Sequence, residues 1–284
     1  MQKIKHLLTI ALTMLASFCF SAYAVEIEIG DRSLNVNIPA GYVELTPAMS
    51  PYYETMRAYI APTNTRYFTL IPTDDADALL RGEVVNLERY INVESQESLD
   101  NVSVSAEMYD SFRDVLRTQM DAIVEEVNKM LPGIVDRGNA RVSEAFDLDV
   151  AVTPGNMVPL PIHVDSANAM VYSMYMKLST SVDGEVTYGG VVSATASTLH
   201  VRDKVLFIYV YGSETDLEWS REFSSRWTEQ IFALNPISMA EQSAVAQSGS
   251  SGIWDGVLKK AAIGALIGGL LGGFGFLIGR RKKE

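Results

Sequence analysis

The sequence predicts an α+β protein with a mainly antiparallel sheet, helices on both faces of that sheet, and one C-terminal transmembrane helix. The second half of the chain holds long stretches of alternating apolar residues, separated by turn pairs such as Asp183-Gly184. Val205–Tyr211 is apolar at every position, which is typical of a strand buried on both faces. Ala261–Gly279 contains no charged residue and is about as long as a membrane-spanning helix.

The first third of the chain predicts short strands and helices. Val25–Ile29 and Leu34–Ile38 alternate apolar with polar residues around Gly30-Asp31, a pattern that predicts a hairpin. Arg66–Ile71 and Arg89–Val93 are predicted strands. The helix between them is expected to begin at Thr73, because its first turn is acidic, and to end at Gly82.

Two longer helices are expected in the exported part of the chain. Apolar residues recur every three or four positions from about Ser105 to Met130, and Pro132-Gly133 is expected to end this helix. Thr215 and Glu218 form a predicted capping box at the start of the second helix. Its apolar residues step by four, and it is expected to end at Asn235-Pro236.

The N-terminus is typical of a secretory signal. Residues 1–24 combine two lysines, a short apolar run and the end Ala22-Tyr23-Ala24, so cleavage is expected before Val25. The single cysteine of the chain, Cys19, lies in this segment. An exported domain without disulfides favours a bacterial periplasm.

The C-terminal region predicts a single-pass anchor. We expect an exported domain over 25–236, a tether rich in Ser and Gly over 237–252, a juxtamembrane segment over 253–260, a transmembrane helix over 261–279 and a cytoplasmic basic tail over 280–284. The basic tail places the C-terminus in the cytoplasm and the domain in the periplasm, anchored to the bacterial inner membrane. An alternative is a sorting tail that is removed by a protease.

The predicted anchor carries glycines on one helical face. Glycines spaced by three or four residues allow two helices to approach closely in lipid, as in a glycine zipper, and so predict a homo-oligomer. The alternative is that glycine is simply common in membrane helices. The glycines of this face are Gly264, Gly268, Gly272, Gly275 and Gly279.

Charge excludes one class of partner. The chain has 23 basic and 35 acidic residues, a net charge of −12, and six of the basic residues lie between Lys259 and Lys283. The predicted exported domain, residues 25–236, is therefore strongly acidic. Such a surface repels a phosphate backbone, so no nucleic acid is expected as a partner.

The candidates for a metal site are few. His163 and Asp165 stand two residues apart on an expected strand, and His200 lies on another, so the three could bind zinc. The alternative is that both histidines are structural, and we expect no cofactor. The sequence contains no recognised nucleophile, metalloprotease or phosphate-loop motif, which favours binding over catalysis.

The order of elements resembles the PsbP-like fold. The resemblance rests on the turn "IPAGY" at Ile38–Tyr42, a late meander of long strands, and a last helix after "DKVLFIYVYG" at Asp203–Gly212. Proteins of that fold are exported accessory and assembly factors of membrane complexes. The resemblance implies a non-catalytic module and carries over no site residue.

Three functions are compatible with these observations. The first is a non-enzymatic, membrane-anchored periplasmic domain that binds a protein partner or a small ligand, for example as an accessory factor of a membrane complex. The second is a glycine-faced helix that drives oligomerisation, with the domain as a sensor. The third is a metal-dependent hydrolase using the residues named above.

Overall fold

The computed structural model of the protein describes residues 24–147, 149–236 and 254–273. Its first half alternates short strands with short helices, and its second half is a strand meander between two long helices. The elements are β1 (Ala24–Ile29), β2 (Arg32–Asn37), β3 (Tyr42–Glu44), η2 (Pro47–Met49), α2 (Tyr52–Ala58), β4 (Asn64–Pro72), α3 (Thr73–Leu80), β5 (Tyr90–Gln96), α4 (Glu97–Asp100), α5 (Ala106–Phe146), β6 (Val150–Pro159), β7 (Val164–Asp165), β8 (Ala169–Val182), β9 (Glu185–Val201), β10 (Lys204–Ser213), η3 (Glu214–Asp216), α6 (Leu217–Leu234) and α8 (Trp254–Gly272).

An antiparallel sheet forms the centre of the molecule. Its eight strands run in the order β3-β4-β5-β10-β9-β8-β6, with β7 paired to β8, and β1 and β2 form a separate hairpin. The turn residues Asp183, Arg202 and Asp203 adopt positive φ, as tight hairpins between long strands require. The predicted mainly antiparallel α+β fold is confirmed.

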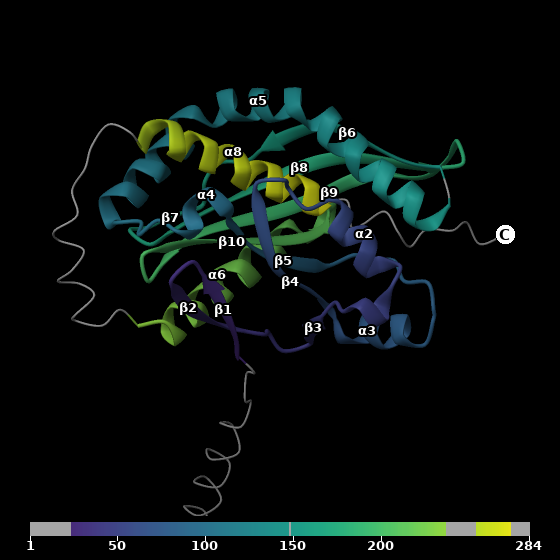
Figure 1. The fold of residues 1–284 in the computed structure, drawn as a ribbon, viewed down its shortest axis with the longest axis horizontal. Helices are drawn as coiled ribbons and strands as arrows, with labels where there is room; N and C mark the ends of the chain where they lie inside the picture. Colours follow the sequence, from purple (N-terminus) through teal and green to yellow (C-terminus); the bar gives the residue numbers. More distant parts are fainter. Residues whose placement is uncertain (1–23, 148, 237–253, 274–284) are drawn as a thin grey trace, which may run out of the picture.

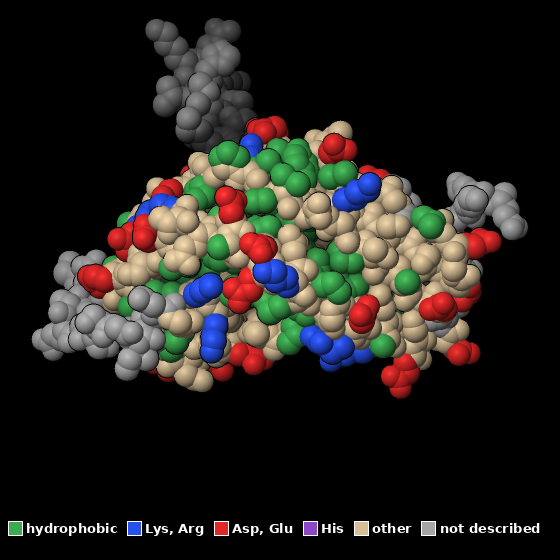
Figure 2. Space-filling model, turned by 90° about the horizontal axis from the view of Figure 1, so that it is seen from above, with side chains coloured by type: hydrophobic (Ala, Val, Ile, Leu, Met, Phe, Trp, Pro, Cys, Tyr) green, Lys and Arg blue, Asp and Glu red, His purple; other side chains and the backbone are tan. Residues whose placement is uncertain are grey.

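Helices cover both faces of the sheet, as the sequence predicts. Helices α5 and α8 lie over one face, with α8 between α5 and the strands, and α6 lies with the β1-β2 hairpin over the other face (Figure 1). Figure 2 shows the outer side of the α5 layer, on which acidic and basic side chains are interspersed.

The side chains of β10 show why both faces need a cover. Val205, Phe207, Tyr209 and Tyr211 belong to the apolar cluster that includes α5 and α8. Leu206, Ile208 and Val210 belong to the cluster that includes Trp227 and Ile231 of α6. The unbroken apolar run in the sequence therefore corresponds to a central strand with two buried faces.

Helix α5 is longer than the sequence predicts. The expected end at Pro132-Gly133 is wrong, because the helix continues through both residues to Phe146. Proline removes one backbone hydrogen bond and its ring crowds the preceding turn. Packing overrides this cost, since Val135 and Val142 extend the buried stripe past the proline.

The start of α6 also differs in detail. The capping box is formed by Ser213, which precedes η3, and Asp216, its last residue, rather than by Thr215 and Glu218. Both pairs have the spacing of the motif, and the one nearer to β10 is used. The expected end of the helix at Asn235 is confirmed.

The C-terminal helix differs most from expectation. The sequence predicts a helix over 261–279, separate from the domain, whereas α8 begins at Trp254 and packs against α5 and the sheet. Every residue from Ala261 to Gly273 is buried. Within the described residues, we find no helix with the length and apolar character needed to cross a membrane.

Several expectations concern other parts of the chain. Residues 1–23 of the predicted signal, the predicted tether from residue 237 onward, residue 253, the end of the predicted membrane helix with Gly275 and Gly279, and the basic tail lie outside the described residues.

The course of α5 through Pro132 can be tested by stability. Pro132 is exposed, so Pro132→Ala restores a backbone hydrogen bond without removing buried contacts. We expect the free energy of unfolding in urea to rise by about 1–3 kcal/mol. Gly133→Ala, at an equally exposed position, should add up to about 1 kcal/mol. Unchanged or lower stability in both variants would mean that the helix ends at the proline.

Candidate helix-binding groove

Strand β5 has a polar face that is buried. Ile91 and Val93 point to the cluster around α6, whereas Asn92, Glu94 and Gln96 alternate with them and lie on the side of α8. These three polar side chains are at most 2% exposed. In sequence, such alternation is typical of a strand with one face in water. Here α8 covers that face.

We call the buried polar side chains of β4, β5 and β10 on this face the polar lane. Its members are Asn64, Arg66, Tyr90, Asn92, Glu94, Gln96, Tyr209 and Tyr211.

Glu94 is the centre of the polar lane. Its carboxylate is fully buried and accepts hydrogen bonds from Arg66 Nε at 2.9 Å and from Asn64 Nδ2 at 2.8 Å. Arg66 also donates from Nη1 to the Met56 carbonyl at 2.9 Å. A buried ion pair of this kind stabilises little in total, but losing one partner costs about 3–5 kcal/mol. The pair therefore holds the lane in one arrangement.

The polar lane donates hydrogen bonds to the backbone of α8. Tyr209 donates to the Ala265 carbonyl at 2.8 Å, Tyr211 donates to the Gly268 carbonyl at 3.1 Å, and Tyr90 donates to the Gly272 carbonyl. Burial raises the pKa of Tyr209 and Tyr211 well above the usual value, so both phenols keep the proton that they donate.

Two amides complete this row of donors. Gln96 Nε2 donates to the Lys260 carbonyl at 3.0 Å, and Asn64 Nδ2 reaches the Gly264 carbonyl at 3.4 Å. The contacted carbonyls thus follow α8 at intervals of at most four residues, about one helical turn.

The glycines of α8 allow this close approach. A Cβ atom at Gly268 would lie 2.6 Å from Asn64 Nδ2 and 2.8 Å from Tyr209 OH, and one at Gly264 would lie 2.8 Å from Gln96 Nε2. Gly272 likewise lies against the Tyr211 hydroxyl. The three described glycines of the predicted packing face therefore contact the sheet of their own chain. Whether the same face drives self-association stays a prediction.

The fit between α8 and the sheet leaves some polar atoms unpaired. Within the described part of the chain, Gln96 Oε1, Arg66 Nη2 and the Tyr172 hydroxyl are buried without a hydrogen-bond partner. Tyr172, on β8, belongs to the same core cluster as α8. Each such group costs about 1–3 kcal/mol relative to water. For Gln96, whose amide contacts α8, docking of the helix carries this cost.

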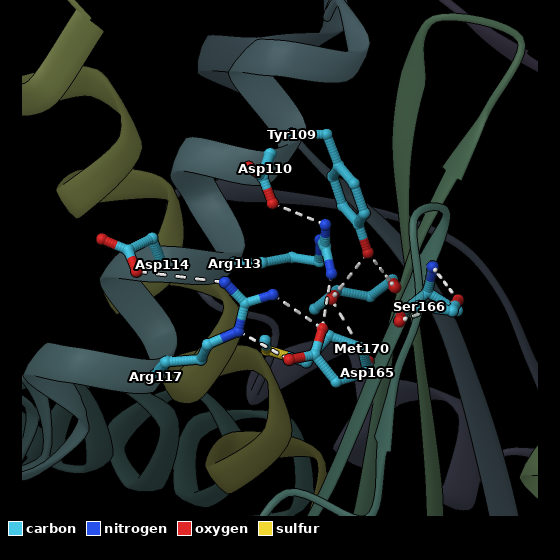
Figure 3. Close-up of polar contacts among 10 residues, drawn as sticks. Tyr109, Asp110, Arg113, Asp114, Arg117, Asp165, Ser166 and Met170 are labelled. Carbon is cyan, nitrogen blue, oxygen red and sulfur yellow. Dashed lines mark hydrogen bonds and ion pairs between the residues drawn. The ribbon is translucent and has the colours of Figure 1, made fainter.

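A second polar cluster holds α5 on the sheet (Figure 3). Asp165 of β7 accepts from Arg113 Nη1 at 2.5 Å and from Arg117 Nε at 2.6 Å. Hydrogen bonds from these arginines, the one from Arg117 first, lower the pKa of Asp165. Arg113 also donates to Asp110 at 2.6 Å. The carboxylate of Asp165 is thus bound by two arginines and attaches α5 to β7.

The three candidate metal ligands are held by separate contacts. His200 Nε2 donates to the Val104 carbonyl at 2.6 Å, and its ring stacks on Tyr109 with centroids 5.0 Å apart. Burial and the positive charge of Arg221 on α6, the helix of the opposite layer, lower the pKa of His163. Asp165 is bound by arginines of α5, as described above. Among the described residues, no group of three or more His, Cys, Asp or Glu side chains could hold a metal ion.

Sequence reasoning did not find the polar lane. The signal was present in β5, where polar residues alternate with Ile91 and Val93, and in the tyrosines at 209 and 211 of β10. Their connection to the glycines of α8 depends on contacts between residues far apart in the chain, such as Tyr211 and Gly268.

No family model matches the chain, and no curated protein matches it. Among solved structures, the chain is similar to cyanobacterial PsbP (CyanoP) from Synechocystis sp. PCC 6803, with 10% identity over 78% of this chain and 96% of that chain, at a TM-score of 0.25. The match is to the fold that the element order resembles.

The hydroxyl contacts can be tested one at a time. Tyr209→Phe and Tyr211→Phe each remove a hydrogen bond to α8, and we expect each to lower the free energy of unfolding by about 0.5–1.5 kcal/mol. Tyr172→Phe is the matched control, because this buried hydroxyl has no partner among the described residues. It should leave stability unchanged or raise it. An equal loss in all three variants would contradict the role of the polar lane.

His200 predicts a pH effect. Burial lowers its pKa below the usual 6.5, while the Val104 carbonyl and two nearby carboxylates oppose the shift. As pH falls through about 6.5, the unfolded chain binds a proton that the folded chain resists, so stability decreases. His200→Gln should reduce this loss between pH 7 and about 5.5, measured by urea unfolding. An identical pH dependence in the variant would show that His200 is not the group responsible.

Proposed function

We propose that this protein is an exported, membrane-associated binding module without catalytic activity, and that the groove between α5 and the sheet is its binding site. The observation that carries the proposal is the contact of the α8 glycines with the polar lane. The groove matches a helix in two ways. The glycines leave room for the side chains of the sheet, and the donors of the polar lane point at helical carbonyls. A partner protein is therefore favoured over a small ligand.

Helix α8 has two environments in which it can be buried. A helix that is apolar on all sides is found either in a protein core or in a membrane. In the structure, the residues from Ala261 to Gly273 are enclosed by α5 and the sheet. The uncharged sequence continues to Gly279 and is followed by four basic residues, which supports insertion into a bilayer as the second environment.

These two environments exclude each other. The residues that contact α5 and the sheet are the same residues that a lipid bilayer would surround, so α8 occupies one site or the other. When α8 is in the bilayer, the polar lane is free. Water can then form hydrogen bonds with its amides, its tyrosines and its ion pair. An apolar groove could not form such bonds, so its exposure would cost more free energy.

The cellular arrangement follows from this alternation. We propose that the domain lies in the periplasm of a bacterium, tethered by α8 to the inner membrane with the basic tail in the cytoplasm. Anchored in this way, the domain presents its groove near the membrane surface, where helices of other membrane proteins emerge. An accessory role at a membrane complex fits this arrangement.

A glycine substitution tests the competition between groove and bilayer. Gly268→Leu places a side chain against Asn64 and Tyr209, so docking should weaken by about 1–3 kcal/mol. We expect the purified full chain to bind lipid vesicles about tenfold more tightly, measured by flotation.

Gly256→Leu is the matched control, because it adds the same apolar side chain to the first turns of α8 where no atom lies within 4 Å. Its flotation should stay close to that of the unmodified chain. Equal flotation of the two variants would show that docking and membrane binding do not compete.

A further inference from the structure

We propose that the groove of one chain accepts α8 from a second copy of the protein, so that two chains exchange their C-terminal helices. The inference rests on the proposed function in one respect, namely that α8 can leave its own groove. It adds the identity of a partner that occupies the groove once α8 has left.

The chemistry of the groove defines what it can bind. The groups of α8 that its donors contact, from Gln96 at one end to Tyr90 at the other, are backbone carbonyls. Its shape requires small residues four positions apart, as at Gly264, Gly268 and Gly272. A second copy of α8 meets both requirements in full, because its sequence is the same.

The connection to the rest of the chain permits exchange. Helix α6 ends at Leu234 and α8 begins at Trp254, so residues 235–253 lie between them. At about 3.3 Å per residue, nineteen residues can reach about 60 Å, which is enough to enter the groove of a neighbouring molecule.

The energetics also favour exchange over an open monomer. A released α8 exposes apolar residues on every side, including Leu266, Ile267 and Leu270, which are at most 4% exposed when docked. Docking into a second chain buries them again and satisfies the same carbonyls. The intramolecular and exchanged forms thus contain identical contacts, and protein concentration decides between them.

An ion pair at the edge of the groove provides a reporter. Lys259 Nζ of α8 lies 3.3 Å from Glu126 Oε2 of α5, and both side chains are about half exposed. The mature chain is expected to contain no cysteine, because Cys19 lies in the predicted signal. Cysteines introduced at these two positions can therefore be joined selectively by a short bismaleimide.

The test uses two differently tagged full-length chains made in the same cells, one with Glu126→Cys and the other with Lys259→Cys. We expect a cross-linked heterodimer carrying both tags, since α8 of the second chain lies in the groove of the first. Adding Gly268→Leu to the Lys259→Cys chain should reduce the heterodimer at least fivefold, whereas adding Gly256→Leu should leave it unchanged.

A chain carrying both cysteines separates the remaining outcomes. If it cross-links within itself while the mixed chains give no heterodimer, α8 stays in its own groove, which overturns exchange but leaves the proposed binding site intact. If, after purification and transfer to buffer without lipid or detergent, it cross-links neither within itself nor to another chain, α8 does not occupy the groove, and both proposals fail. A heterodimer that persists with Gly268→Leu would place the dimer contact elsewhere and overturn exchange.

Discussion

The structure depends on one contact, the fit of a glycine face against a row of buried polar side chains. Tyr209 and Tyr211 can reach the backbone of α8 only because Gly268 and Gly272 carry no side chain. This contact closes one face of the sheet. It also gives α5, which lies outside α8, an apolar surface on which to pack (Figure 1).

The same contact limits how firmly α8 is held. An apolar sheet face would bind an apolar helix with little desolvation cost. The polar lane, however, includes the buried Arg66–Glu94 pair and leaves Gln96 Oε1 unpaired within the described residues. Part of the gain from burying α8 is therefore offset by the desolvation of polar groups. A sheet face of this composition is consistent with the proposal that α8 can leave the groove and return to it.

Much of the fold could be predicted from the sequence, because its signals are local. The β1-β2 hairpin, the two-faced strand β10 and the end of α6 at Asn235 follow from alternation, unbroken apolar character and a stop signal. The end of α5 could not be predicted, since its continuation through Pro132 depends on packing by Val135 and Val142. The packing of Ala261–Gly273 into the domain, where the sequence predicts a transmembrane helix, could not be predicted, because a core helix and a membrane helix share the same composition.

The most direct measurement is the reactivity of a single cysteine placed in α8. Ala262 is fully buried in the structure, whereas Gly256, six residues earlier, is exposed. In aqueous buffer without lipid or detergent, Ala262→Cys should react with a maleimide at least a hundredfold more slowly than Gly256→Cys, and equally fast after unfolding in urea. Equal rates in the native protein would mean that α8 is not enclosed by α5 and the sheet, and would contradict this account.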